Sequence, residues 1–501
     1  LARRVKDKWK DRSHLAELNL KAGRQARAAS AFEQALKYFT IGLELLGDAA
    51  WKRYYPLVLS LHEEATEMSS LCARFDLMEK LAGAVKDNAQ DDLDLVHVYL
   101  CLIQKYTTRG QLKKAMETGE EILEKLGCKL SPLSTEQWQQ ILVQIKPSLV
   151  GKSVEDVMQF ERLTQTDAEK IVEILYRVQL AYGEAGFSLD DGHYLSAISK
   201  RTSLLLNHFY PDYSPDFYCH VGSAYSMILQ DHEFAYEVGC LAIQLMETVD
   251  LKKINSGVSK TFNISIRPLK EPLSASLDPL LEAHQIGIET GDFYNAGRCA
   301  ISRCQIAFMC GKDLNWLKRE LSTLKLSLNK IDYVIGSPQV EMLTKIVKIL
   351  MEESLSMSSN IVDQYERVTG PEYRYNDNIF YNYQKLMLQY LFEEYEAARE
   401  TVFEMTILMK NSKNALVDPL ANCYMSLALL AVCSQLSEGE KEEIHTQVDD
   451  NQEMLEKLAR SAPPNYLHKH HLVEAERMRV LEGERDATMS HCDQAIALSR
   501  E

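Results

Sequence analysis

One stretch of the sequence, Asp91–Gly127, restricts the fold more than any other. Apolar residues recur there three and four positions apart on both sides of a break at Thr107–Gly110. This spacing places them on one face of each of two helices. Gly110 and Gly127 suit the left-handed backbone conformation that ends a helix. Because helices this short cannot bury their apolar faces alone, the stretch predicts a helix pair that needs neighbours of the same kind.

Small residues recur at matching offsets elsewhere in the chain. A small residue early in the second helix of a pair lets the first helix cross it at short range. The pattern therefore predicts stacked helix pairs, with turn glycines at equivalent places. The predicted turn glycines are Gly23, Gly110, Gly291 and Gly483. The other predicted repeat-packing residues are Ala28, Phe32, Ala35, Ala115, Gly119, Ala296 and Ala495.

The spacing resembles the tetratricopeptide repeat, although Ile103 stands where a glycine is usual and Gly127 where a proline is usual. The resemblance implies an all-α solenoid of helix-turn-helix repeats. The predicted divisions are a basic helix that joins a preceding module (1–20), first repeats (21–130), divergent helical repeats (131–254), an irregular proline-containing break (255–272) and a second set of repeats that continues beyond the chain (273–501).

Charge and composition narrow the range of partners. The formal net charge of −16 over 501 residues repels nucleic acid and anionic lipid. The most apolar run, 425–436, is too short to span a bilayer. We therefore expect no nucleic-acid partner and no membrane insertion. The basic residues of the first helix either form a solvated face or contact a neighbouring domain. The start of the chain looks like part of a longer protein.

Cysteine usage indicates a cytoplasmic protein. The eleven cysteines are an odd number, and none forms a CxxC pair. Cys299, Cys304 and Cys310 are the densest group, but their spacings do not place three thiolates on one side of a helix. We predict buried small apolar residues there rather than a metal site.

Three histidines, His468, His470 and His471, follow a proline pair near the C-terminal end. His468 and His471 share a helix face but lack a third ligand at useful spacing, so an exposed helix start is predicted rather than a metal site. Between residues 207 and 217 lies an aromatic loop, which either anchors a peptide or, as we favour, plugs the end of a groove between helices.

Gly151-Lys152-Ser153 invites comparison with a phosphate-binding loop. That motif needs a glycine five positions before Gly151, where this sequence has Lys146. It also needs a preceding strand, which the sequence does not predict. No GxSxG or HExxH motif occurs either. We therefore expect a non-catalytic segment that binds no nucleotide, metal or other cofactor.

A narrower resemblance covers nearly the whole chain from about Leu15. It is carried, in order, by LAELNLKAGRQARAASAFEQALKYFTIGLELL, LGDAAWKRYYPLVLSLHEEATE, GKSVEDVMQF, PLKEPLSASLDPLLEAHQIGIETGDFYNAG and PPNYLHKHHLVEAERMRVLEG. These runs are similar to the segment that follows the ATPase module in very large microbial signalling kinases. Those proteins join a serine/threonine kinase-like domain, a predicted AAA-type ATPase, helical repeats, a GAF domain and often a histidine kinase.

This resemblance implies a regulatory, protein-interaction scaffold that belongs to a multidomain signalling kinase with an ATPase module. Its expected partners are the flanking domains of the same polypeptide and other proteins or peptides. It carries over no catalytic residue, because the kinase and ATPase motifs lie outside this sequence. An alternative stays open, in which the array is the inducer-binding sensor arm of an ATPase-coupled transcription regulator.

Overall fold

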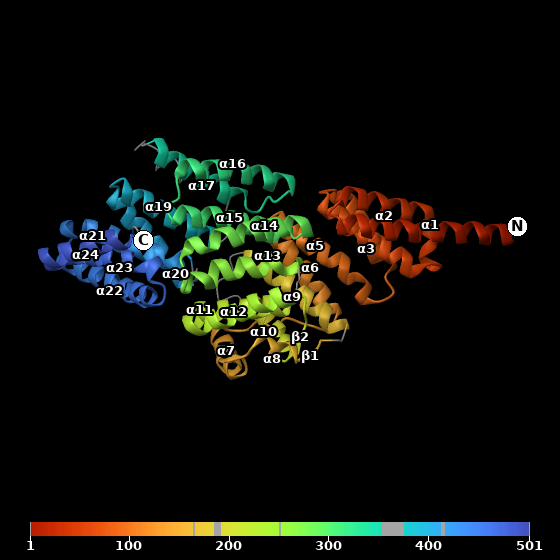
Figure 1. Ribbon diagram of the computed structural model, residues 1–501, viewed down its shortest axis with the longest axis horizontal. Coiled ribbons are helices and arrows are strands. Elements are labelled where there is room, and N and C mark those ends of the chain that lie inside the picture. Colours follow the sequence, from red (N-terminus) through yellow and green to blue (C-terminus); the bar gives the residue numbers. More distant parts are fainter. Residues whose placement is uncertain are drawn as a thin grey trace.

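The computed structural model describes residues 2–163, 166–184, 192–249, 252–352, 375–411 and 416–499. These residues form an elongated array of helices, with the first helices at one end of the long axis and the last helices at the other (Figure 1). Within the described residues, the one sheet is a parallel pair of two-residue strands, β1 (Glu161–Arg162) and β2 (His208–Phe209). The predicted all-α solenoid is confirmed.

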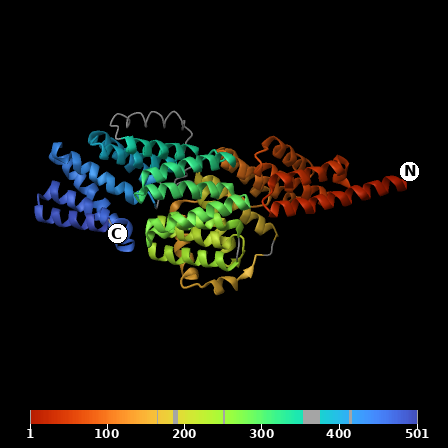
Figure 2. The same cartoon turned by 45° about the horizontal axis from the view of Figure 1, so that its top comes forward.

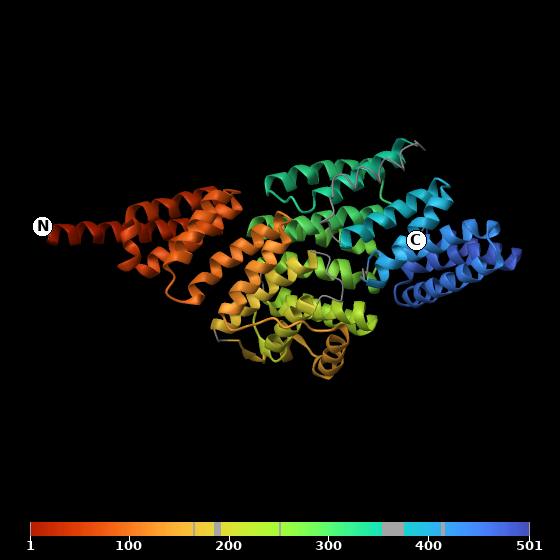
Figure 3. The same cartoon turned by 180° about the vertical axis from the view of Figure 1, so that it is seen from behind.

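The N-terminal end consists of three antiparallel helix pairs, with two short 3₁₀ turns between them. The elements are α1 (Ala2–Ala28), α2 (Phe32–Leu46), η1 (Asp48–Lys52), α3 (Tyr55–Leu71), α4 (Phe75–Asn88), η2 (Asp92–Leu95), α5 (Val96–Thr108) and α6 (Leu112–Lys125). Seen from behind, α5 and α6 lie between this end and the middle of the molecule (Figure 3).

The middle of the molecule holds most of the remaining helices. Its first part is α7 (Thr135–Leu149), α8 (Val154–Met158), α9 (Thr166–Glu184), α10 (Gly192–Leu205), α11 (Ser214–Leu229) and α12 (His232–Val249). Its second part is α13 (Lys252–Thr261), the π-turn η3 (Phe262–Ile266), the 3₁₀ turns η4 (Arg267–Leu269) and η5 (Leu273–Ser276), α14 (Leu277–Thr290), α15 (Phe293–Met309), α16 (Leu314–Lys330) and α17 (Ser337–Glu352).

The C-terminal helices stack beside the middle of the molecule, as the tilted view shows (Figure 2). They are α19 (Tyr375–Leu391), α20 (Tyr395–Asn411), α21 (Asp418–Val432), η7 (Cys433–Gln435), α22 (Glu438–Ser461), α23 (Pro463–Arg477), the π-turn η8 (Met478–Glu482) and α24 (Arg485–Leu498).

The fourth residue of the second helix is a fully buried alanine in several pairs. Ala35 of α2, Ala115 of α6, Ala235 of α12, Ala296 of α15 and Ala398 of α20 all have no exposed surface. At this point the two helices of a pair cross, and a methyl group lets their backbones approach closely. The shared position defines the register of the repeat.

This register corrects the prediction for Gly23. Gly23 was expected to end a helix, but it lies inside α1, and the turn before α2 is formed by Ser30 at φ +57°. A Cβ atom on Gly23 would lie 2.3 Å from Cε1 of the buried Phe39. Its small size thus serves close packing, and Ser30 takes the place that Gly110 (φ +75°) has between α5 and α6.

The other predicted repeat residues take varied positions. Gly291 (φ +79°) precedes α15 and Gly483 (φ +68°) precedes α24, each in a left-handed turn. In the first pair, Ala28 is exposed at the end of α1 and Phe32 is half-buried at the start of α2. Ala495 is buried in α24.

Two predicted divisions are wrong. The boundary at residue 20 falls inside α1, which runs without interruption to Ala28. The segment 255–272, predicted as an irregular break, is helical through α13, η3 and η4. Pro268 lies in the first turn of η4, where a missing amide hydrogen breaks no helical hydrogen bond. The prolines therefore end the helical run without disturbing α13.

Contacts between distant parts of the chain close the array on itself. The Ser30 hydroxyl donates to the carbonyl of Glu289 at 2.8 Å, and Phe32 makes an edge contact with Phe293 at 6.4 Å between ring centroids. Arg109 forms an ion pair with Asp332. The α1–α2 turn and the α5–α6 turn thus both contact the region from α14 to α17.

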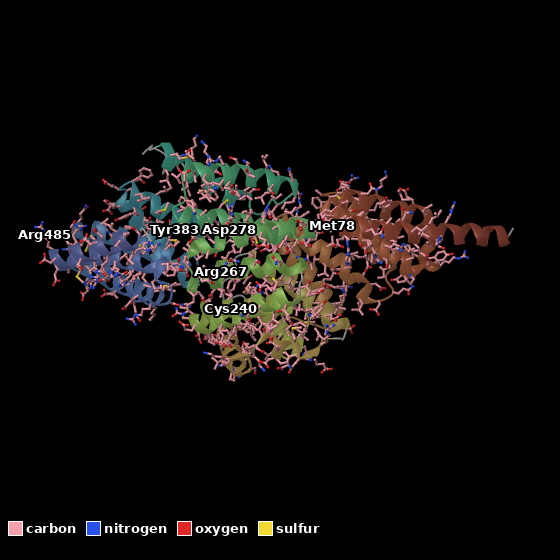
Figure 4. The ribbon with its side chains drawn as sticks, in the orientation of Figure 1. Met78, Cys240, Arg267, Asp278, Tyr383 and Arg485 are labelled. Atoms are coloured by element: carbon pink, nitrogen blue, oxygen red, sulfur yellow. The ribbon has the colours of Figure 1, made fainter. Side chains whose placement is uncertain are left out.

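The last helix pair is tied to the middle through Asn465, which is 4% exposed. Its side-chain amide donates to the carbonyls of Pro268 (2.9 Å) and Glu271 (2.8 Å), and its oxygen accepts from the amide of Leu273 (2.8 Å). Arg267, labelled in the middle of Figure 4, braces the same segment by donating to the carbonyl of Ala275 at 3.0 Å. One side chain thus satisfies three backbone groups of an irregular segment.

Candidate functional site

A polar cavity of about 220 Å³ lies in the middle of the array, between α9, α10, α11, α13 and α15. Its walls carry the carboxylate of Glu184, the cationic side chains of Lys260 and Arg298, and His220, together with hydroxyl and amide groups. The lining residues are Gln179, Leu180, Gly183, Glu184, Tyr194, His220, Ser223, Lys260, Thr261, Ile264, Ser265, Tyr294 and Arg298.

Lys260, next to the end of α13, presents its ammonium group to this cavity. Nζ donates to Oδ1 of Asn295 at 2.9 Å and lies 5.3 Å from the centroid of the Tyr294 ring. Within the described part of the chain, Nζ forms no ion pair with a carboxylate. Burial lowers the pKa of Lys260, the positive charge of Arg298 lowers it further, and the charges of Asp216 and Glu184 offset part of this shift.

Among the described residues that line the cavity, Glu184 is the only one with a carboxylate, and this carboxylate already has two partners. It accepts from the Tyr294 hydroxyl at 2.6 Å, and Nε of Arg298 lies 3.3 Å from the same oxygen. Burial, reinforced by the charge of Glu184, raises the pKa of Tyr294, so this hydroxyl stays protonated as a donor. Arg298 is therefore balanced by Glu184, whereas Lys260 is not balanced by a carboxylate.

A buried ion pair supports one wall of the cavity. Arg201 and Asp216 pair at 2% and 1% side-chain exposure, and Arg201 also donates to Oε1 of Gln179 at 3.1 Å. Nδ1 of His220 lies 3.2 Å from the Asp216 carboxylate. Burial raises the pKa of Asp216, but the charges and hydrogen bonds of His220 and Arg201 outweigh it and hold the pKa below its usual range.

A glycine in α13 leaves room for a tyrosine hydroxyl of α9 beside Lys260. A Cβ atom on Gly257 would lie 2.7 Å from the Tyr176 hydroxyl. The Asn295 amide donates to that hydroxyl at 2.9 Å and to Asp292 at 2.8 Å. Asn295 thus has its donors fixed towards α9 and its own helix, which turns its oxygen to Lys260.

The arrangement is suited to binding more than to nucleophilic catalysis. Nδ1 of His220 faces Asp216, and among the described residues no hydrogen bond joins His220 to a hydroxyl of the cavity. What the site offers is an ammonium group that is not ion-paired among the described residues, beside the ion pair of Arg298 with Glu184 and several hydrogen-bonding groups. Such a group attracts an anion when the surroundings are poor in water.

Sequence reasoning missed this cavity. Its residues come from α9, α10, α11, α13, η3 and α15 and follow no fixed spacing, and none of the predicted repeat-packing residues lines it. One of them, Ala296, lies in α15 between the lining residues Tyr294 and Arg298. One signal was present in the sequence: Lys260 occurs three positions after Gly257 inside the run 255–272, which was interpreted as a break.

The Gly151-Lys152-Ser153 stretch connects two helices. The Gly151 amide donates to the Glu237 carboxylate at 3.0 Å, and the Ser153 hydroxyl accepts from the amide of Asp156 as the N-cap of the five-residue helix α8. Lys152 lies 5.3 Å from the Phe160 ring centroid. The Gly151 amide is thus already bonded to a carboxylate, whereas the amides of a phosphate-binding loop are free to bind phosphate.

The cysteine and histidine clusters are placed within helices. Cys299 and Cys304 are buried and Cys310 is half-buried, and burial raises the pKa of each thiol. Nδ1 of His471 lies 2.9 Å from Nδ1 of His491 in α24. No group of three or more metal-ligating side chains is assembled among the described residues.

His468 contacts Lys469 and is half-buried in α23. Burial, with the charge of Lys469, lowers the pKa of His468 to about 4. His470 lies beside His471, with 5.6 Å between their ring centroids. The predicted exposed helix start is therefore half-buried for all three of these histidines.

The aromatic loop at 207–217 is packed inside. Phe209 and Tyr213 are almost fully buried, and Tyr213 stacks on Tyr176 of α9 at 5.3 Å between ring centroids. Its carbonyl accepts from Arg201. The favoured prediction of a plug between helices is confirmed, and this plug seals the network beside the cavity.

Comparisons with known proteins give limited similarity. No protein-family model matches the chain. Hybrid signal transduction histidine kinase G of Dictyostelium discoideum is 23% identical over 158 residues, which are 30% of this chain and 5% of that protein. The yeast Tom70 crystal structure is similar over 97% of this chain and 92% of that chain, at 12% identity and a TM-score of 0.33. No helix of the described residues has the length and apolar character needed to cross a membrane.

Proposed function

We propose that this chain is a non-catalytic regulatory and protein-interaction scaffold of a multidomain cytoplasmic signalling kinase that contains an ATPase module. Its partners are the flanking domains of the same polypeptide and other proteins. The partial similarity to hybrid signal transduction histidine kinase G supports the signalling context. The architecture supports the scaffold role, because stacked helix pairs present extended surfaces to partners.

The observation that carries this proposal is the closure between distant helix pairs. In an ordinary repeat array each unit contacts only its neighbours. Here the turn before α6 is ion-paired through Arg109 to Asp332, and the turn before α2 is bonded through Ser30 to Glu289. Because packed interiors resist small deformations, a displacement of the first helices is passed to the α14–α17 region as well as to the next pair.

The test uses the full-length polypeptide and breaks one closing contact. Arg109→Ala removes the ion pair with Asp332, and Arg460→Ala is the control, because Arg460 pairs with Glu456 on the exposed face of one helix. We expect Arg109→Ala to change how phosphoryl transfer responds to inactivation of the ATPase, and Arg460→Ala to leave that response unchanged. A full-length reading frame without kinase and ATPase modules, or a wild-type response in a folded Arg109→Ala variant, would refute the proposal.

A further inference from the structure

We propose that the central cavity binds a small organic monocarboxylate, whose carboxylate pairs with the Lys260 ammonium group. The proposal rests on the charge, size and lining of the cavity and does not depend on the proposed signalling role. It assigns a ligand-binding site to the middle of the array, between α9, α11, α13 and α15.

The charges of the cavity leave one positive group to be balanced. Lys260 and Arg298 are positive, and Glu184 is the carboxylate that engages Arg298 at 3.3 Å. The Asp216 carboxylate is engaged by Arg201 and His220 in the wall. A single negative charge would neutralise the remaining ammonium group, whereas a phosphate dianion would leave an unbalanced negative charge beside Glu184.

Lys260 is half-buried, and its ammonium group has few protein acceptors in its surroundings. An ammonium group has three donors, and within the described residues Nζ uses one, towards Asn295. Burial and the charge of Arg298 lower the pKa of Lys260 more than the charges of Asp216 and Glu184 raise it, so the ammonium group is compensated only in part in the free protein. A carboxylate supplies both the charge and the missing acceptors.

The size and lining of the cavity set the class of ligand. About 220 Å³ is below the range of drug-sized pockets and admits a compound of a few carbon atoms. Hydroxyls of Ser223, Thr261 and Ser265 line the same space, and they can bond to a hydroxyl or carbonyl group of the ligand. Short hydroxy acids match these features better than fatty acids or sugars.

The experiment measures thermal unfolding of the whole chain in sodium acetate and sodium L-lactate, against sodium chloride at equal ionic strength. We expect Tm to rise with both carboxylates once their concentration exceeds a Kd of about 1–10 mM, and then to increase with the logarithm of the concentration. Inorganic phosphate is expected to give a smaller rise, because of its second charge. Line broadening of ¹³C-acetate provides a second readout that does not depend on stability.

Three variants test the role of Lys260. Lys260→Met should abolish the carboxylate effect, and Lys260→Arg should retain part of it. Lys318→Met, which alters an exposed lysine of α16, should leave it unchanged. The proposal is overturned if neither carboxylate raises the Tm of the wild type above the value in sodium chloride, or if folded Lys260→Met responds as the wild type does. A larger effect of phosphate than of acetate would overturn the charge argument.

Discussion

Replacing Asn465 with alanine tests how the last helix pair is held against the middle of the array. The substitution removes two donated hydrogen bonds, to Pro268 and Glu271, and one accepted from the amide of Leu273. These backbone groups belong to η4, η5 and the turn between them, where the chain makes few regular helical hydrogen bonds.

The expected destabilisation follows from these three bonds. A typical intramolecular hydrogen bond contributes about 0.5–1.5 kcal/mol net, so three contribute roughly 3 kcal/mol, with more if the freed groups stay buried without water. The side chain is 4% exposed, so screening by solvent reduces this value little. We expect the free energy of unfolding of the C-terminal helices to fall by about 3 kcal/mol.

Chemical unfolding and amide hydrogen exchange measure the effect together. Asn451→Ala is the matched control, because Asn451 is also a buried asparagine but makes one bond, to the Ser426 hydroxyl at 3.1 Å, within the C-terminal helices. We expect the control to lose about 1 kcal/mol. Only Asn465→Ala should speed exchange at the amide of Leu273. Equal losses in the two variants, with unchanged exchange at Leu273, would refute the reasoning.

Three further predictions concern packing and pH. Gly23→Ala should lower stability by about 1–3 kcal/mol because its Cβ would overlap a buried ring of α2, whereas Gly83→Ala, which has open space in α4, should raise it by about 0.5–1 kcal/mol in thermal unfolding. Ala115→Trp should lower Tm far more than Lys113→Ala, because the alanine is fully buried and the lysine side chain is 87% exposed; equal Tm values would contradict the assigned helix face. The neutral form of His468 is favoured in the folded state, so its contribution to the free energy of unfolding is complete above its unfolded pKa of about 6.5 and is lost as pH falls towards its folded pKa of about 4. In urea unfolding, the stability difference between pH 7.5 and pH 5 should therefore be about 1–2 kcal/mol smaller in His468→Gln than in the wild type. An equal difference in the two proteins would contradict this.

Local patterns in the sequence predict the helices well, because each helix face is determined by residues three and four positions apart. The unit from η2 to α6 illustrates this: the glycine turn and the buried faces of Tyr99 and Ile122 follow from spacing alone. The register of the first pair could not be obtained in this way. Gly23 and Ser30 both precede small residues at suitable offsets, and only contact with Phe39 distinguishes a packing glycine from a turn residue.

The cavity depends on contacts that no local pattern records. Lys260 and Glu184 are far apart in the chain, and the fold brings them to the walls of the same cavity. The prolines at 268 and 272 suggested an irregular chain, but the effect of a proline depends on its place in the helical run. Hence the fold class can be predicted from the sequence, whereas the polar cavity can be identified only from the three-dimensional structure.

The hydrogen bond from Asn465 to the carbonyl of Pro268 also limits how this chain can change during evolution. Open repeat arrays gain or lose whole units easily, because a new unit needs to fit only its two neighbours. Here an added or deleted helix pair between α14 and α22 would move Asn465 away from the backbone groups that it satisfies. The same holds for a change between α2 and α14, which would separate Ser30 from Glu289. We therefore expect homologues to vary in loop length and surface residues while keeping the number of helix pairs between these contacts constant.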